Sequence, residues 1–510
     1  MITGNPHLNP AHLTGLAWVW GHAYDGMYNP VVFSAWWSLI RLAGKPNAQL
    51  FHASNLAVHF SSVILVFFLL RRLVQSDWPA AAGTILFAIH PLQVEPVVWA
   101  AGMKDLLSSF FALASLWAYL QFVRRRNWLA YTAATGLYFL ALLAKPSMVT
   151  LPLIAAALEY LYLSTESPVA RFNFRRPAIL LGPWVAAAAI ITVVATSVQP
   201  AGDIDGGPLW ARPLIAADAL AFYLWKLVWP LDLAIHYGRT PHFVVTPSWH
   251  GLAPAWITWI LPAGLAVALA YWRRPALLAA AFTFAAALLP VLGLHKFSFQ
   301  TYSTVADRYV YLAMLGPALA AAWLVKQCPR RVTIALAALG SLSLAATSFV
   351  QAGYWIDTET LYRHSLSINF DDFDAHHNIG LILAGRDDVL GAMQEYQTVI
   401  AEHPDSPPEY RYVADALTAM GDWPAAADYA KRLIEMQPKM QPSHQSNPSE
   451  LHCWLGGIYL RWAKATAATE PAAAGKTFAQ AKEELNESLR LDPANARAAG
   501  LLADAQHRLQ

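Results

Sequence analysis

Apolar residues dominate the first 350 positions of the chain and become much rarer after them. Up to about residue 350 the sequence consists of long apolar runs separated by sparse charges, and beyond Asp357 it is polar with helical periodicity. An apolar run of about 20 residues is long enough for a helix to cross a bilayer. The pattern therefore predicts an all-α chain with a membrane domain followed by a soluble helical domain.

Ten apolar runs are predicted to span the membrane. They lie near residues 50–70, 79–90, 97–122, 128–145, 147–163, 178–197, 255–272, 276–294, 305–326 and 332–350. Another apolar stretch, 214–237, is predicted to be re-entrant or interfacial. Counting it as a span would move Arg273 and Arg274 away from the side that holds the other basic clusters.

The basic clusters between the runs predict the topology. They are Arg71-Arg72, Arg124-Arg125-Arg126, residues 171–177, Arg273-Arg274 and residues 326–331. Placing all of them in the cytoplasm satisfies the positive-inside rule. We therefore expect an integral membrane protein with three parts: an outer first loop with interfacial helices (1–49), a transmembrane domain (50–350) and a repeat domain on the outer side (351–510). Four tryptophans of the first loop fit interfacial helices or ordinary aromatic anchoring: Trp18, Trp20, Trp36 and Trp37.

The polar carboxy-terminal region carries an internal repeat. Ala392 and Ala426 are 34 residues apart, as are Pro404 and Pro438, which is the tetratricopeptide-repeat (TPR) period. The repeat positions are Gly380, Ala392, Tyr396 and Pro404, then Ala414, Gly421, Ala426 and Pro438, then Gly456, Tyr459, Ala481 and Pro493. Residues 353–369 are predicted to form a preceding half repeat, 465–477 to lengthen the third hairpin and 494–510 to cap the array. Such an array binds an acceptor or partner protein in its groove, or serves as a scaffold packed on its own membrane domain.

Composition narrows the function further. The chain is 56% hydrophobic and 13% charged with a net charge of +2, and no basic stripe indicates nucleic-acid binding. Cys328 and Cys453 lie in different predicted domains, so free thiols are expected rather than a disulfide or a metal site.

Charged residues inside apolar runs are the first candidates for function, because a charge in hydrocarbon is costly unless it is paired or useful. Glu95 could cap a helix start or act as an active-site acid, and His90 could be a helix C-terminal partner. Lys104 and Asp105 could form a buried ion pair or line a polar pocket.

Further polar residues recur at helical spacing. Asn55 and His59 share a face with His52, which favours interhelical hydrogen bonds, with pocket lining as the alternative. No acidic motif accompanies the histidines, so a metal site is not expected. Lys145 and Arg308 are candidates for binding a donor phosphate. The alternatives are interfacial snorkelling for Lys145 and a local Asp307–Arg308 pair.

Several motifs occur in an order that resembles a known family. They are "HASNLAVHF", "FAIHPLQVEPVVWAAGMKDLLSSFFAL", "LLAKPSMVTLP", "YLWKLVWPLDLAIHY" and "ADRYVYLAMLG", followed by the repeats. The chain resembles the transmembrane and tetratricopeptide-repeat protein O-mannosyltransferases and their bacterial relatives, which are glycosyltransferases of the GT-C fold. The resemblance covers nearly the whole chain, and the family also has an acid at the position of Asp105.

The resemblance implies transfer of a sugar from a polyprenyl-phosphate donor to a hydroxyl acceptor, such as protein Ser or Thr, on the outer side of the membrane. The resemblance to the bacterial relatives implies a bacterial inner membrane, with the repeat domain (351–510) periplasmic. The donor is a co-substrate, and no other cofactor is implied. The family's catalytic acidic pair would lie upstream of Met1, together with a first helix; Asp25 does not match it, and Asn29 replaces an expected cation. The alternatives are a non-catalytic TPR scaffold or a polymerase or ligase for lipid-linked surface glycan.

Overall fold

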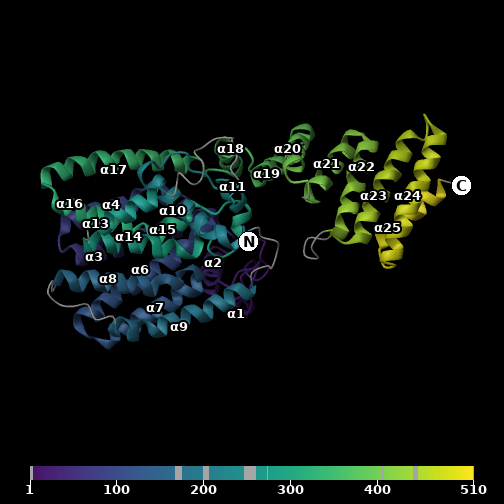
Figure 1. Ribbon diagram of the computed structural model, residues 1–510. Coiled ribbons are helices and arrows are strands. Elements are labelled where there is room, and N and C mark those ends of the chain that lie inside the picture. Colours follow the sequence, from purple (N-terminus) through teal and green to yellow (C-terminus); the bar gives the residue numbers. More distant parts are fainter. Residues whose placement is uncertain are drawn as a thin grey trace. The chain divides into compact units, whose positions relative to one another are not determined.

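The computed structural model describes residues 4–166, 175–198, 206–245, 260–272, 274–404, 407–439 and 446–508. Within these ranges the chain forms helices and no named strand (Figure 1). It divides into two compact units, Met1–Asp357 and Thr358–Gln510. The predicted all-α fold is confirmed.

Each predicted span coincides with a helix of the first unit. These helices are α3 (Ala48–Val74), α4 (Asp77–Ile89), α6 (Met103–Arg125), α7 (Trp128–Ala144), α8 (Leu151–Glu166), α9 (Arg175–Val198), α13 (Ile260–Trp272), α14 (Pro275–Leu288), α15 with α16 (Val310–Ala313 and Leu315–Gln327) and α17 (Arg330–Gly353). Of the predicted span 255–272, residues 255–259 lie outside the described residues. Among the described residues, five helices are long and apolar enough to cross a membrane, and two bent pairs bring the number to seven.

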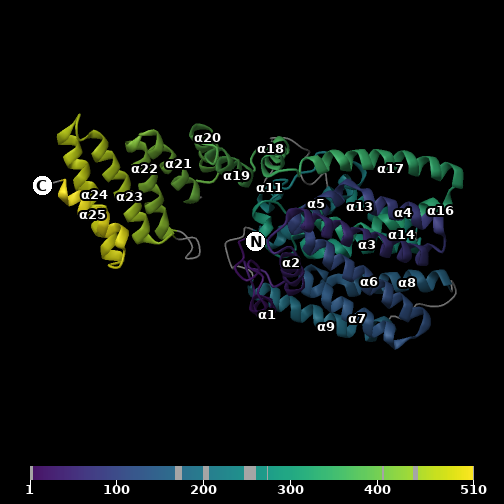
Figure 2. The same cartoon turned by 180° about the vertical axis from the view of Figure 1, so that it is seen from behind.

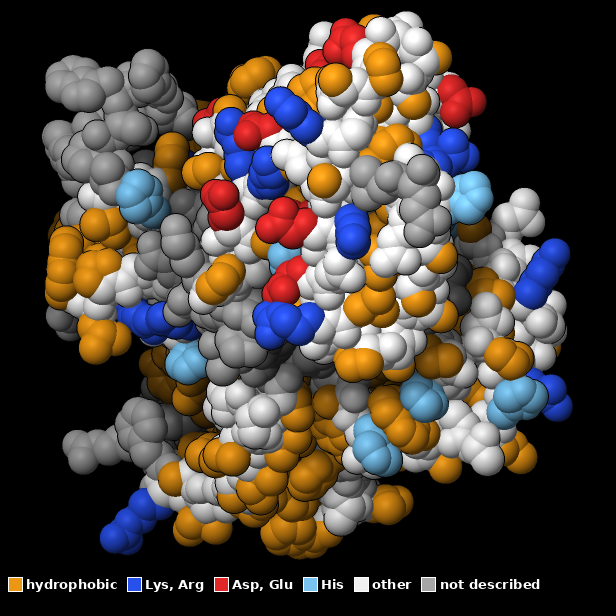
Figure 3. Space-filling model, turned by 90° about the vertical axis from the view of Figure 1, so that its right-hand side faces the viewer, with side chains coloured by type: hydrophobic (Ala, Val, Ile, Leu, Met, Phe, Trp, Pro, Cys, Tyr) orange, Lys and Arg blue, Asp and Glu red, His pale blue; other side chains and the backbone are white. Residues whose placement is uncertain are grey.

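The surface of these helices suits a lipid environment. Along α17 the outward side chains are apolar, as at Leu336, Leu339 and Leu342, which are 65–70% exposed. On the face drawn in Figure 3, hydrophobic side chains gather in a patch in the lower part of the picture. A water-exposed bundle would carry charged side chains on its outer face, so the first unit is that of an integral membrane protein.

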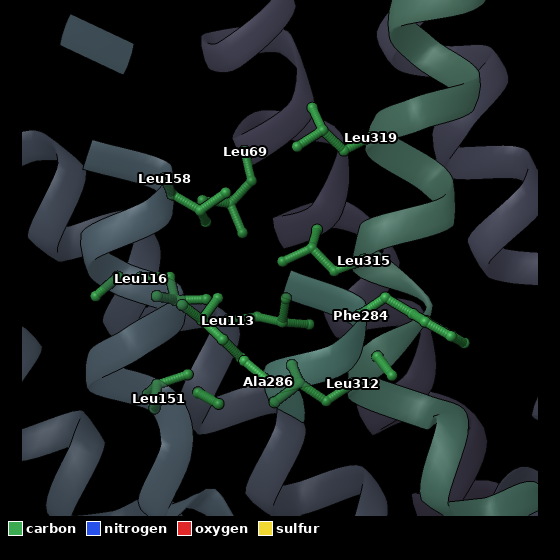
Figure 4. Close-up of a cluster of buried hydrophobic side chains, with 14 of the residues drawn as sticks. Leu69, Leu113, Leu116, Leu151, Leu158, Phe284, Ala286, Leu312, Leu315 and Leu319 are labelled. Atoms are coloured by element: carbon green, nitrogen blue, oxygen red, sulfur yellow. The ribbon is translucent and has the colours of Figure 1, made fainter. Parts of the chain in front are cut away.

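Leucine side chains from several helices interlock in the centre of the first unit. Figure 4 shows Leu69 of α3, Leu113 of α6 and Leu158 of α8 near Leu315 and Leu319 of α16. Where α4 and α14 cross α16, a glycine lies at each contact, Gly83 of α4 and Gly316 of α16, so that no side chain separates the two backbones. A Cβ on Gly83 would meet the backbone oxygen of Ala318, and one on Gly316 would lie 2.5 Å from the oxygen of Ala280. Small residues of this kind allow membrane helices to approach closely.

One end of the bundle collects the basic residues. Lys326, near the end of α16, donates to the Val74 carbonyl at the end of α3 (2.7 Å). Arg72 donates to Tyr162 of α8 (2.9 Å), and Arg176 at the start of α9 pairs with Glu159 of α8 (3.3 Å). The helix directions therefore bring the arginines of α3, α6, α9 and α17 to a common end, here called the basic end.

The opposite end carries α1 (Leu13–Gly21), α2 (Pro30–Ala43) and α10 (Arg212–Val228). Trp36 of α2 is 1% exposed and packs with Met103 and Ala144. It therefore belongs to the core, and the expected role as an interfacial anchor is wrong for this residue. Both ends of α10 are attached here: Arg212 donates to the Leu294 carbonyl (3.1 Å), and the Leu227 carbonyl contacts His90 (3.2 Å). An apolar helix held at both ends on one side of a bundle does not cross it.

The second unit is a stack of antiparallel helix pairs (Figures 1 and 2). The pairs are α19 (Phe373–Ala384) with α20 (Val389–Glu402), α21 (Pro407–Met420) with α22 (Trp423–Met436), and α23 (Pro448–Thr466) with α24 (Pro471–Leu491). α18 (Thr358–Ile368) precedes them as the predicted half repeat, and α25 (Ala496–His507) follows as the cap. The longer third hairpin results from two helices of 19 and 21 residues, against 12 and 14 in the first pair.

Small residues set the spacing inside each pair. A Cβ on Gly380 would lie 2.5 Å from the Tyr396 ring, and one on Gly456 would lie 2.7 Å from Leu485. Ala392, Ala426 and Ala481 are buried at the helix contacts. These are the positions at which the sequence predicts small residues, and the TPR architecture is confirmed.

Candidate functional site

The candidate charged residues lie where several helices begin or end, opposite the basic end. After α4 the chain turns through the short helix η1 (Pro91–Gln93) into α5 (Val94–Val98), with a bend of 55°. It then passes through η2 (Ala100–Gly102) into α6. At Gly102 any side chain would collide with the backbone carbonyl of Pro96. This tight return places the start of α6 directly beside α5.

Glu95 and Arg308 form a buried ion pair. The Arg308 guanidinium donates to Glu95 Oε1, and the Arg308 backbone N–H donates to Oε2 (2.9 Å). The two side chains are 3% and 6% exposed. The structure therefore rejects the local Asp307–Arg308 pair. Capping does not account for Glu95 either, because both of its oxygens are bound by Arg308.

Asp105 pairs with Lys145 and not with its neighbour Lys104. Lys145 follows the last turn of α7 and donates to Asp105 Oδ1, which places it in the protein interior rather than snorkelling to an interface. Asp105 Oδ2 is buried and makes no hydrogen bond within the described residues. Asp105 thus keeps one acceptor oxygen available.

Aromatic rings surround the cations. The Arg308 guanidinium carbon lies 4.0 Å from the Phe299 ring centre, 5.1 Å from Tyr309 and 5.5 Å from Trp99. Lys104 lies 5.5 Å from the same Trp99 ring, and Lys145 lies 5.1 Å from Tyr309. Sequence analysis missed these rings, although Trp99 follows Glu95 by one helical turn and Tyr309 adjoins Arg308. Rings at these distances stabilise positive charge.

Lys104 differs from the other two cations. It is partly exposed and lies against Trp99, and within the described residues it forms no ion pair with a carboxylate, although Asp105 and Glu95 attract its charge. Three cations (Lys104, Lys145 and Arg308) therefore accompany two carboxylates (Glu95 and Asp105). The cluster carries an excess positive charge next to an aromatic ring, which suits an anion.

A small cavity of about 10 Å³ adjoins the cluster, with room for about one water molecule. Its polar lining comes from Asp105, Lys145, Arg308, Ser109 and Ser147. Ala287, Val291 and Leu312 supply the apolar side. Both predicted phosphate-binding residues and the predicted pocket residue Asp105 therefore line one cavity, which holds no more than a water molecule in this structure. Its cations are the groups that bind an anion, and the open Asp105 oxygen is an acceptor for a hydroxyl.

A second polar network lies beside the first and was not predicted. Tyr237 donates to Asp307 (2.7 Å), and Arg239 binds Asp218 through two guanidinium nitrogens. Lys226 donates to the carbonyls of Leu231 and Asp232. These contacts fold the segment after α10 onto the residues next to Arg308.

The remaining candidates hold the helices around the cluster. Asn55 donates to the carbonyls of Val97 and Trp99 (3.2 and 2.8 Å), and His59 contacts the Tyr311 hydroxyl (2.8 Å) and the Ala88 carbonyl (3.1 Å). His90 accepts from the Leu92 N–H and contacts the Leu227 carbonyl. The contacts of Asn55 and His59 are the predicted interhelical hydrogen bonds, whereas His52 is exposed. His90 was predicted as a helix C-terminal partner, and its contact is with a carbonyl in the last turn of α10. Within the described ranges no three metal-binding side chains come together.

Comparison with curated proteins finds protein O-mannosyltransferases. "Protein O-mannosyl-transferase F38B6.6" of Caenorhabditis elegans is 24% identical over 395 residues, covering 74% of this chain and 54% of that protein. Human "Protein O-mannosyl-transferase TMTC4" is 22% identical over 448 residues, covering 75% and 60%. "Protein O-mannosyl-transferase Tmtc1" of Drosophila melanogaster is 31% identical over 132 residues, covering 26% and 15%. The chain thus spans less than two thirds of the length of these relatives.

No protein-family model matches the chain. Among solved structures, yeast Tom70 is 10% identical, covers 88% of each chain and superimposes with a TM-score of 0.23. The curated relatives of the chain are therefore TMTC-type protein O-mannosyltransferases at low identity, in agreement with the family resemblance.

Proposed function

We propose that this relative of the protein O-mannosyltransferases is a membrane glycosyltransferase that moves a sugar from a polyprenyl-phosphate donor to a protein hydroxyl. The observation that carries the proposal is the cavity where Lys145 and Arg308 meet the open oxygen of Asp105, with the unpaired Lys104 beside it. A donor phosphate needs cations, and a donor dissolved in the bilayer needs them at an end of membrane helices.

Each charged group has a distinct role in this proposal. Lys104 attracts the phosphate, because among the described residues no carboxylate forms an ion pair with it and it lies beside two further cations. Arg308 and Lys145 are positioned by Glu95 and Asp105, and they stabilise the charge that develops on the leaving phosphate. Asp105 Oδ2 accepts a hydrogen bond from a sugar or acceptor hydroxyl. Neither paired carboxylate is assigned as the general base, because each is already engaged in an ion pair with Arg308 or Lys145.

The repeat unit would present the acceptor. A solenoid of stacked helix pairs exposes an extended surface that suits a protein segment. The polar groups on its first helices include His377 and Glu409, which are joined at 2.6 Å, and Asp415, which accepts from the Trp454 indole at 2.8 Å. We place the active side on the outer face of a bacterial inner membrane, because the basic end then lies in the cytoplasm.

The test is donor turnover by the full chain in proteoliposomes that contain radiolabelled polyprenyl-phosphate mannose and a Ser/Thr-rich protein acceptor. We expect label on the acceptor, and we expect Lys104→Ala to raise KM for the donor about tenfold while Lys104→Arg largely retains activity. Lys482→Ala, an exposed lysine of the repeat unit, is the matched control.

The opposite result has a defined meaning. If the folded chain binds acceptor protein through its repeats but never consumes the donor, the transferase proposal is wrong and the chain is a scaffold. If the donor is consumed and the sugar enters a lipid-linked glycan instead of protein, the acceptor assignment is wrong.

A further inference from the structure

A groove lies at the basic end of the bundle, far along α6 from the charged cluster. Its volume is about 310 Å³. It is lined by Phe122 and Arg126 at the end of α6, Trp128 at the start of α7, and Arg176, Ile179 and Leu180 at the start of α9. α6 has 23 residues, about 35 Å in length, so one hydrocarbon thickness separates the groove from Asp105.

One wall of the groove is strongly basic. Arg126 lines the groove and is exposed, as are Arg124 and Arg125 before it in the chain, and within the described residues none of the three forms an ion pair. Arg176 pairs with Glu159, whose other oxygen accepts from Tyr119 (2.6 Å). Among the described residues, two further guanidinium nitrogens of Arg176, Nε and Nη2, are buried and have no hydrogen-bond partner. An unsatisfied buried guanidinium is unfavourable, and a bound anion would relieve it.

The other wall is apolar and open. Ile179 is 75% exposed on the outer face of α9, and Leu180 and Phe122 continue the apolar surface inward. Trp128 is 62% exposed and packs on Phe122 with ring centres 5.2 Å apart, at the level where tryptophan anchors membrane proteins. Arginines above an apolar wall at this level match a lipid with an anionic head group and hydrocarbon chains. A soluble anion would leave the apolar wall unused.

We propose that this groove binds an anionic phospholipid of the surrounding bilayer. The phosphate lies between Arg126 and Arg176, and an acyl chain follows Phe122, Ile179 and Leu180. Basic pockets at the ends of membrane helices bind anionic lipid head groups in this way. A zwitterionic lipid would bring its own cation next to the arginines and bind less well. This site depends on the bundle lying in a membrane and not on the proposed transferase activity.

The test is native mass spectrometry of the purified full chain in detergent with added phosphatidylglycerol or phosphatidylcholine. We expect retention of phosphatidylglycerol in preference to phosphatidylcholine, and a loss of affinity of about fivefold for Arg126→Gln and more for Arg126→Gln/Arg176→Gln. The matched control, Arg330→Gln/Arg331→Gln, removes two exposed arginines from the same end without touching the groove and should leave lipid retention unchanged.

Because Arg176 also neutralises buried Glu159, the double variant could fold poorly. Arg126→Gln and Ile179→Asp change exposed side chains and test the phosphate and the acyl chain separately. The proposal is overturned if both variants keep wild-type lipid retention, if the control loses as much as the groove variants, or if phosphatidylcholine binds equally well. It is also overturned if inorganic phosphate at matched concentration displaces the lipid.

Discussion

Arg308 binds both carboxylate oxygens of Glu95 across 213 residues of sequence, once through its guanidinium and once through its backbone N–H. The pair therefore fixes the backbone next to α15 against α5, as well as the two side chains. A buried ion pair that is also satisfied by a backbone donor has a defined geometry. It holds Arg308 under Phe299 and Tyr309, where the guanidinium meets the cavity.

Removing one partner of this pair should destabilise the bundle far more than removing both. Glu95→Gln or Arg308→Gln alone is expected to lower the free energy of unfolding by about 3–5 kcal/mol, because an unpaired charge remains buried. The double variant should lose less than either single variant, because no unpaired charge then remains buried. Denaturant unfolding of the full chain in mixed micelles measures the coupling.

An exposed ion pair provides the comparison. Arg71 and Asp77 are joined at 2.6 Å with side chains 52% and 71% exposed. A double-mutant cycle with Arg71→Gln and Asp77→Asn should give an interaction energy of no more than about 1 kcal/mol. Equal coupling at the two sites would show that Glu95 and Arg308 are not desolvated in the membrane, and would remove the basis for their positioning role.

Variants of the Asp105–Lys145 pair should affect the stability of the bundle and its donor turnover differently. Asp105→Asn keeps the side-chain shape but leaves Lys145 buried without its counter-charge, so we expect lower stability and donor turnover reduced about 100-fold. Asp105→Asn/Lys145→Gln should recover much of the stability and none of the turnover. Thermal unfolding and donor turnover, measured on the same preparations, test this. Recovered turnover in the double variant would mean that the pair is only a structural lock.

The helices could be predicted from the sequence, because their length and apolar character are local properties. The ten apolar runs coincide with helices and the 34-residue spacing marks the repeats, since each depends on neighbours in sequence. The partner of each buried charge depends on tertiary packing. Local reasoning offered Lys104 for Asp105 and Asp307 for Arg308 as alternatives to pocket and phosphate-binding roles. The fold instead brings Lys145 to Asp105 and Glu95 to Arg308 from elsewhere in the chain.

The aromatic residues around the site could not be predicted from local sequence either, because their contacts also depend on tertiary packing. Trp99, Phe299 and Tyr309 are ordinary membrane-protein residues by composition, and 200 residues separate Trp99 from Phe299. Their role appears only when Arg308 lies against both rings. The network of Asp218, Arg239 and Tyr237 was likewise missed, because it depends on α10 and the following segment returning to the same end of the bundle.

Gly380 should be intolerant of a methyl group, unlike a glycine that faces open space. Gly380→Ala would bring a Cβ to 2.5 Å from the Tyr396 ring, and Tyr396 is 2% exposed, so the ring has little room to move. We expect a loss of about 1–3 kcal/mol in the stability of the α19–α20 pair. Gly475→Ala in α24 meets nothing within 4 Å and should stabilise its helix by about 0.5–1 kcal/mol. Hydrogen exchange of the amides in each pair measures both effects, and similar results for the two variants would contradict the packing argument.

His377 should make the contact between α19 and α21 stronger in mild acid. Its hydrogen bond to Glu409 raises the pKa of His377 above 6.5 against the opposing effect of burial, with further support from the charges of Glu409 and Asp374. The faces packed against it also carry the hydroxyls of Tyr396 and Tyr412. Because the folded-state pKa lies above the unfolded one, the stabilisation is fully present below the unfolded pKa and is lost as pH rises through the folded pKa.

Hydrogen exchange in α19 and α21, corrected for intrinsic rates, should therefore show protection falling between about pH 6 and pH 8. His377→Gln and Glu409→Gln should each flatten this dependence; a slope that survives both changes would assign the effect to another group.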